Sequence, residues 1–156
     1  MITKTAERTA LSRATIVDRA LALADLEGTD AITVRRLAQE FGVTPMALYW
    51  HVKNKDELLA AMGDRFFDEI PAVPASGTWT ERLRAVMASL VESLRQHPAS
   101  AHLAGPRVLQ CPPGQELAEQ TLALLRAAGF SVTRATDIAR TAMQTAIMLV
   151  TEQAGA

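Results

Sequence analysis

Apolar residues recur at helical spacing along almost the whole chain, and the pattern gives no sign of a β-strand. The first predicted helix begins after Ser12, whose hydroxyl can accept a hydrogen bond from a free N–H group of the first turn. It ends at Gly28, a residue type that readily closes a helix. The apolar face of this helix consists of Ile16, Ala20, Leu23 and Ala24. The predicted fold class is all-α.

A longer helix is predicted over residues 54–70, where apolar side chains follow one another at four-residue spacing. It is broken by the stretch 71–77, which is rich in proline and small residues and is typical of a domain boundary. We therefore expect a first domain over residues 1–70 and a second over residues 71–156.

The second half of the chain repeats the helical pattern. Thr78 and Glu81 have the spacing of a capping box, which predicts a helix start. Residues 98–114 contain four prolines and two glycines and are predicted to form a loop region. One further helix is expected to end at Gly129, and the last is expected over residues 133–152.

Composition narrows the class of protein. The single cysteine, Cys111, cannot form an internal disulfide, which favours a reducing compartment such as the cytoplasm. No apolar run reaches the roughly 18 residues that cross a bilayer, and residues 1–8 lack the apolar region of a secretory signal. We also find no glycine-rich phosphate loop, nucleophile elbow or zinc-type Cys/His spacing, so we expect no enzyme.

Residues 33–52 have the pattern of a helix-turn-helix. Two short helices, over residues 34–41 and 44–52, are separated by Gly42, which tolerates the positive φ of a tight turn. Ala38 is small enough to let the helices cross closely. The apolar positions that would clamp the inside are Leu37, Phe41, Val43, Leu48 and Val52. In a helix-turn-helix the second helix enters the major groove of DNA; the alternative is an ordinary helical hairpin.

Charge supports the DNA interpretation only locally. Residues 1–70 carry nine Lys or Arg against eleven Asp or Glu, which gives no indication of nucleic acid. Residues 33–55, however, carry four Lys or Arg against one Glu, and cations beside a recognition helix suit phosphate contacts. Tyr49 and Trp50 are adjacent, so at least one should be exposed, unless both belong to the core.

From residue 12 to residue 70 the chain resembles the DNA-binding domain of the tetracycline-repressor family, most closely in the run Leu48-Tyr-Trp-His-Val-Lys-Asn-Lys55. The resemblance implies a three-helix helix-turn-helix domain joined by a long helix to a helical ligand-binding and dimerisation domain. It implies that Thr33 and Arg35 touch DNA, that Thr44, Pro45, Met46 and Ala47 face base edges, and that Tyr49, Trp50, His51 and Lys55 hold phosphates. Residues 45–47 replace polar base-reading residues of the family, so a different operator is expected.

The resemblance continues beyond Gly77 into the family's effector domain. It implies a mostly apolar pocket lined by Val86, Met87, Leu90, His102, Leu103, Arg107, Met143, Gln144, Ile147 and Met148, although each of these could be plain core or surface. His102 and Glu152 match positions near a magnesium ion that is bound together with the drug in the family. Other drug contacts are replaced by apolar residues, so we expect an apolar or magnesium-chelated small molecule and no required cofactor.

The leading hypothesis is a ligand-responsive repressor that binds a palindromic operator as a homodimer. The alternative is a small-molecule-binding or interaction module that does not bind an operator. The family's helical bundle usually continues with two more helices, so the C-terminus is either incomplete here or the chain dimerises without them. The last helix, residues 133–152, is expected to pack against its two-fold mate, or else only against residues 83–94 of its own chain.

Overall fold

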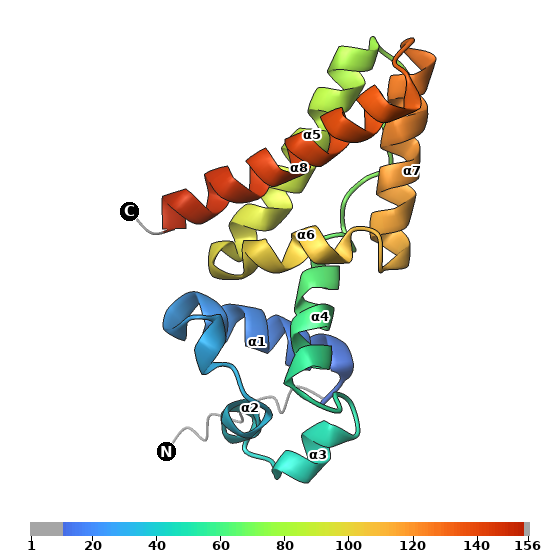
Figure 1. The fold of residues 1–156 in the computed structure, drawn as a ribbon. Helices are drawn as coiled ribbons and strands as arrows, with labels where there is room; N and C mark the ends of the chain where they lie inside the picture. Colours follow the sequence, from blue (N-terminus) through green and yellow to red (C-terminus); the bar gives the residue numbers. More distant parts are fainter. Residues whose placement is uncertain (1–10, 155–156) are drawn as a thin grey trace, which may run out of the picture.

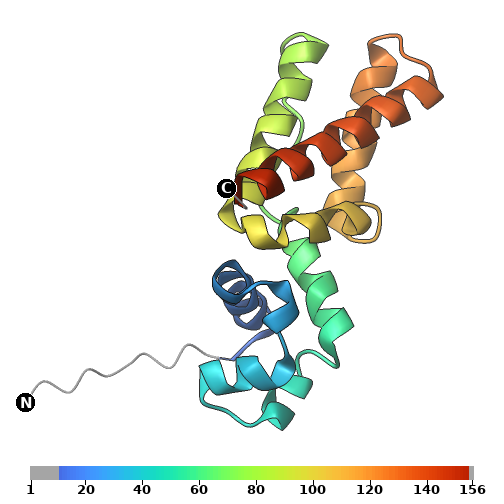
Figure 2. The same cartoon turned by 60° about the vertical axis from the view of Figure 1, so that its left-hand side comes forward.

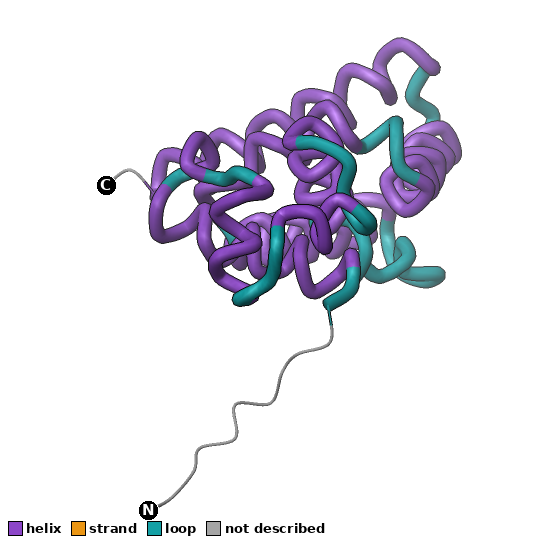
Figure 3. The backbone as a smooth tube through the Cα atoms, turned by 90° about the horizontal axis from the view of Figure 1, so that it is seen from below, coloured by secondary structure: helices purple, strands orange, loops and turns teal. Residues whose placement is uncertain are grey.

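The computed structural model describes residues 11–154, and all regular structure within these residues is helical (Figure 1; Figure 3). The helices are α1 Arg13–Glu27, η1 Thr29–Ala31, α2 Val34–Phe41, α3 Pro45–Tyr49, α4 Lys55–Arg65, α5 Trp79–Gln96, η2 Pro98–Leu103, α6 Ala104–Arg107, α7 Pro112–Ala127 and α8 Val132–Ala154. The predicted all-α class is confirmed. Among residues 11–154, no helix combines the length and apolar character that crossing a membrane requires.

Helices α1–α4 gather at one end of the molecule, and α5, α7 and α8 at the other (Figure 1). We call the first group the head and the second the bundle. The short helices η2 and α6 lie between them, where they pack against α4 on one side and α8 on the other. Figure 2 shows the same arrangement, with α4 rising from the head to meet this middle layer.

Local capping explains where most helices begin and end. The Ser12 hydroxyl accepts a hydrogen bond from the Thr15 N–H, and the Thr15 hydroxyl accepts one from the Ser12 N–H, so α1 starts with a full capping box. Gly28 ends α1 with a φ of 83°. Thr78 and Glu81 form the predicted capping box of α5. These three predicted boundaries are confirmed.

The helix predicted over residues 54–70 is shorter than expected. In the structure it is α4, which ends at Arg65. Phe66 and Phe67, which follow the helix, are both buried. The hydroxyl of Ser93 on α5 donates a hydrogen bond of 2.7 Å to the Phe66 carbonyl, which a longer helix would have used internally. The connection from the head to the bundle therefore turns at residue 66.

The prediction of a loop region over residues 98–114 is wrong, since η2, α6 and the start of α7 lie there. Its prolines occupy first-turn positions: Pro98 begins η2 and Pro112 begins α7. Proline is well tolerated in a first turn because the N–H that it lacks would have no partner within the helix. These prolines start helices rather than break them.

Most of the buried apolar side chains form one connected cluster that extends from the head through the middle layer into the bundle. Leu21 of α1, Met62 of α4, Ala101 of η2 and Leu90 of α5 all belong to this cluster and are at most 2% exposed. A continuous core means that displacing the middle layer must disturb packing on both of its sides.

Candidate DNA interface and ligand cavity

Helices α2 and α3 pack together through Leu37, Ala38 and Leu48, none of which is more than 1% exposed. Thr33 caps α2 and Thr44 caps α3, each through its side-chain oxygen. Gly42 lies between the helices in the left-handed conformation, at φ 64° and ψ 34°. The predicted turn therefore has the geometry for which glycine is favoured, and the small residue Ala38 is buried.

The outer surface of α3 is open to solvent and largely apolar. Met46 is 66% exposed, Tyr49 45% and Trp50 85%, so both adjacent aromatic residues face outward. Thr33, Arg35, Thr44 and Pro45 are also exposed, while Ala47, His51 and Lys55 are half-buried. The ten predicted DNA-contacting residues thus lie on or beside α2, α3 and the start of α4; their contact with DNA stays a prediction.

Not all of the local positive charge is available to a ligand. Arg36 forms ion pairs with Glu27 at 2.7 Å and with Glu40 at 2.5 Å, and Arg19 also pairs with Glu40. The hydrogen bonds from Arg36 and Arg19 lower the pKa of Glu40. Arg36 therefore braces α2 against the end of α1, whereas Arg35 on the same helix is exposed.

The turn after α3 is tied to the rest of the head by hydrogen bonds. Arg13 of α1 donates to the His51 carbonyl at 3.0 Å and to the Glu57 carboxylate at 2.5 Å. The Lys55 ammonium donates to the Asp30 carbonyl at 3.1 Å. The bonds from Arg13 fix the turn after α3 relative to α1 and α4, and the Lys55 ammonium, a predicted phosphate contact, has further N–H groups besides the one that bonds Asp30.

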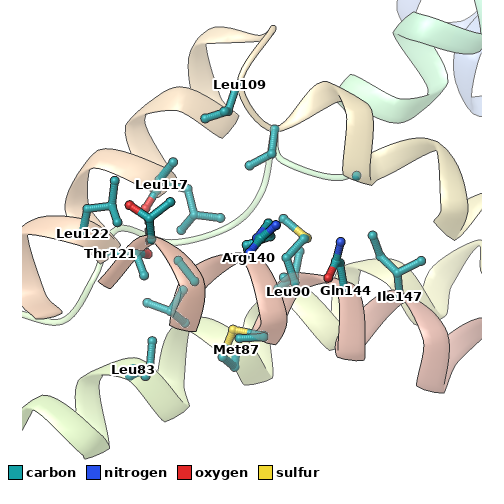
Figure 4. Close-up of a pocket in the computed structure, with 18 of the residues that line it drawn as sticks. Leu83, Met87, Leu90, Leu109, Leu117, Thr121, Leu122, Arg140, Gln144 and Ile147 are labelled. Atoms are coloured by element: carbon teal, nitrogen blue, oxygen red, sulfur yellow. Dashed lines mark hydrogen bonds between the residues drawn. The ribbon is translucent and has the colours of Figure 1, made fainter. Parts of the chain in front are cut away.

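A cavity of about 560 Å³ lies in the bundle, bordered by α5, α6, α7 and α8 (Figure 4). Its lining is mostly aliphatic, with Thr121, Thr136, Arg140 and Gln144 as its polar members. Figure 4 shows Arg140 and Gln144 of α8 among apolar neighbours such as Met87 and Leu90 of α5. A large apolar space with a few polar groups is typical of small-molecule sites.

Six of the ten residues predicted from sequence line this cavity, namely Val86, Met87, Leu90, Met143, Gln144 and Ile147. The other four lie outside its wall. His102 is exposed on η2, and Met148 is 50% exposed on α8. The Leu103 carbonyl faces Gly63 of α4, and Arg107 is bound to an aspartate of that helix.

Sequence reasoning missed Arg140 and Thr136, although a signal for them was present. Both lie at multiples of four residues before Gln144, so they share its side of α8. Arg140 forms an ion pair with Asp137 at 2.8 Å and still lines the cavity. Neither residue is apolar, so the apolar pattern of the helix did not single it out.

The metal prediction receives no added support from the single chain. His102 and Glu152 are both exposed, on η2 and α8 respectively. Within residues 11–154, no group of three or more His, Cys, Asp or Glu side chains is arranged to hold a metal ion. A metal-binding role for His102 and Glu152 stays a prediction.

Two polar links connect the head to the middle layer. The Arg107 guanidinium donates to both carboxylate oxygens of Asp64, at 2.6 and 3.1 Å, and this bidentate pair joins α6 to α4. Asp25 at the end of α1 contacts the His97 ring at 2.7 Å and accepts a bond from the Ala99 N–H at 3.3 Å. Because Gly105 and Pro106 of α6 line the cavity, one short helix touches both the cavity and the head.

Comparison with known proteins gives matches for both halves of the chain. An HTH-type transcriptional regulator of Saccharopolyspora erythraea is 36% identical over 121 residues, covering 77% of this chain and 51% of that protein. The structure of ActR from Streptomyces coelicolor in complex with actinorhodin superposes with a TM-score of 0.78 at 34% identity, covering 93% of this chain and 70% of that one. BioQ bound to its double-stranded DNA operator superposes with a TM-score of 0.75 at 31% identity, covering 93% and 88%.

The family itself follows from two family models. The first, for bacterial regulatory proteins of the tetR family, matches residues 16–62. The second, for the tetracyclin repressor-like C-terminal domain, matches residues 71–155 and so more than half of the chain. The chain spans about half the length of the first curated relatives, 51% of one and 44% of another. It belongs to the tetracycline-repressor family of transcriptional regulators.

Proposed function

We propose that this chain supplies the DNA-binding and effector-binding parts of a dimeric transcriptional repressor that a small molecule releases from a palindromic operator. Residues 1–70 would form the DNA-binding domain and residues 71–156 the effector-binding and dimerisation domain, and the protein would act in the cytoplasm without catalytic activity. The observation that carries the proposal is the exposed, capped helix α3 on a head that is hydrogen-bonded to α6, the short helix whose Gly105 and Pro106 line an apolar cavity.

The surface of the head suits the two kinds of contact that a helix-turn-helix makes. The second helix of such a motif enters the major groove with its N-terminal residues toward the bases. In this chain that helix is α3, and its first residues are exposed. Arg35, Trp50 and Lys55 lie around it and carry N–H groups that can donate to phosphate oxygens.

The middle layer offers a route by which an effector could act on the head. Gly105 and Pro106 line the cavity, and the next residue, Arg107, holds Asp64 of α4 through two hydrogen bonds. A ligand that moves α6 would therefore also move Arg107, which is bonded to Asp64 of α4. Release from DNA needs only that the ligand bind the non-binding arrangement of the heads more tightly, by about 1.4 kcal/mol for each tenfold shift.

Dimerisation would supply the second head that a palindromic operator requires. Half-sites lie about 34–36 Å apart, or a multiple of this, on one face of the duplex. The adjacent residues Met148 and Leu149 of α8 are 50% and 49% exposed in the single chain, which is the kind of apolar surface that a two-fold partner covers. Sedimentation of the chain at tens of micromolar tests this part, and a monomer would show that α8 alone is not a sufficient interface.

Operator binding is tested by selection from a pool of random duplex DNA, followed by fluorescence anisotropy on the selected sequence. Arg35→Ala should weaken binding, because it removes an exposed cation beside α3. Arg126→Ala, which removes an exposed cation from α7 in the bundle, is the matched control and should not. If no sequence is enriched above non-specific binding, the chain is instead a ligand-binding or interaction module.

The effector is tested on the same DNA complex. Small apolar molecules are added with and without magnesium, and release of the DNA is measured. Release that survives EDTA indicates an apolar effector held by the aliphatic wall of the cavity, and release that requires magnesium indicates a chelated one involving His102 and Glu152.

A further inference from the structure

The first turn of α3 presents an unusual surface for reading DNA bases. Pro45 has no backbone N–H, Met46 ends in a thioether and is 66% exposed, and Ala47 offers a methyl group. Thr44, which carries a hydroxyl, is the cap residue before the helix, and its oxygen accepts from the Ala47 N–H at 3.4 Å. The base-facing part of α3 therefore offers carbon and sulfur where recognition helices commonly offer hydrogen-bonding groups.

The polar groups of the same segment lie elsewhere. Tyr49 and Trp50 come at the C-terminal end of α3, whereas the residues of a recognition helix that reach base edges are those at its start. Arg35 belongs to the first turn of α2, and Lys55 to the first turn of α4. These side chains surround the first turn of α3 without belonging to it.

Only one group in the major groove matches an apolar surface. Guanine, cytosine and adenine present hydrogen-bond donors and acceptors there, whereas thymine adds the C5-methyl group. A donor or acceptor covered by Met46 without a partner would lose its hydrogen bond to water, which costs binding energy. A thymine methyl group covered by Met46 instead gains from leaving water.

We propose that α3 reads its half-site through thymine C5-methyl groups, by apolar contact with Pro45, Met46 and Ala47. The half-site therefore carries thymine at the base pairs that face the first turn of α3, and methyl contact rather than hydrogen bonding sets the preference there. This inference rests on the proposed function, because it requires α3 to lie in the major groove.

The test removes a methyl group and nothing else. After a binding sequence has been selected from random DNA, each thymine of a half-site is replaced in turn by deoxyuridine, and affinity is measured by anisotropy at fixed salt. Burial of one methyl group is worth about a fourfold change in affinity. We expect an affinity loss of about fourfold at one or two thymines of the half-site. Changing the equivalent thymine in both half-sites should cost about sixteenfold.

Two protein variants assign the effect to α3. Met46→Ala should reduce the preference for thymine over deoxyuridine at its position, since the thioether no longer covers the methyl group. Lys55→Ala is the control, because removing a phosphate-binding ammonium from α4 weakens binding to both sequences equally and leaves their ratio unchanged. Met46 is exposed, so its replacement should not disturb folding, which circular dichroism checks.

Three results would overturn the inference. A selected half-site in which every thymine tolerates deoxyuridine with less than a twofold change refutes methyl readout while leaving operator binding intact. A thymine preference that is unchanged in Met46→Ala and in Ala47→Gly refutes its assignment to α3. Failure to select any sequence removes the proposed function and this inference together.

Discussion

Replacing Gly63 by alanine should destabilise the packing of α4 against the middle layer. Gly63 is buried in α4, and a Cβ atom built there would lie 2.5 Å from the Leu103 carbonyl oxygen and 2.6 Å from Cγ of Arg107. Gly63 is not among the glycines with positive φ, so alanine is conformationally allowed. Both clashing atoms belong to the elements that pack on α4, which means that α4 or the middle layer must move.

The size of the effect follows from two opposing contributions. Forcing an extra carbon into a packed site costs about 1–3 kcal/mol, and here one of the obstacles is backbone that cannot rotate away. Alanine in a helix interior recovers about 0.8–1 kcal/mol of intrinsic preference over glycine. Because backbone blocks the site, we take the upper part of that cost, about 2–3 kcal/mol, and expect a net loss of about 1–2 kcal/mol in the free energy of unfolding and a fall in Tm of about 2–8 °C.

Gly105→Ala is the matched control, since it makes the same chemical change in the neighbouring helix α6. A Cβ atom at Gly105 would meet only Cδ1 of Ile147, at 3.3 Å, and this is the free end of a flexible side chain. Its stability should stay within about 0.5 kcal/mol of the parent or rise slightly. Both variants are compared by urea and thermal unfolding at one protein concentration, because association would shift Tm. If Gly63→Ala proved as stable as Gly105→Ala, the close approach of α4 to η2 and α6 would be wrong.

The remaining predictions concern the cavity, the DNA contacts and acid stability. Ala142→Phe places a ring in the cavity and should abolish release by the effector while operator binding persists, whereas a full response would locate the effector site elsewhere. Lys55→Ala should weaken binding to all sequences and reduce the slope of log K against log salt by about one unit; an altered base preference would contradict a phosphate role. The lowered pKa of Glu40 implies a stabilising contribution that is complete above the ordinary glutamate pKa of 4.5 and is lost as pH falls through the lowered pKa. The stability gap between the parent and Glu40→Gln should therefore be constant near neutral pH and close below pH 4.5, and a gap that widened in acid would contradict the ion pairs with Arg36 and Arg19.

Helix boundaries that depend on neighbouring residues were predictable from sequence. Ser12, Thr33 and Thr78 cap helices through bonds that span three residues, and Gly42 closes α2 through its own backbone conformation. Such signals are complete within a short window of sequence. The end of α4 was not predictable in this way, because the Phe66 carbonyl is taken by a side chain 27 positions further along.

Those parts of the candidate site that depend on residue type and on adjacent positions could be predicted from the sequence. Exposure at the end of α3 was expected because Tyr49 and Trp50 are adjacent, whereas the aliphatic pocket was expected from the family resemblance. The charge count around α3 was less informative, since Arg36 is neutralised by Glu27 of another helix. Arg140 was missed because a charged residue on a helix is usually a solvated one, and only the arrangement of α8 beside α5 brings it to the cavity.

The short helix α6 explains why a cavity in the bundle should matter to the head. A helix of four residues has almost no stability of its own, so its position is determined by the elements that touch it. On one side Gly105 and Pro106 border the cavity, and on the other Arg107 holds Asp64 of α4 by two bonds that fix both distance and orientation. A very short helix is thus in contact with both the cavity and the head. Under the proposed function, a ligand that fills the cavity would shift α6, and the Arg107–Asp64 pair would pass that shift to α4, the helix that follows α3 in the chain.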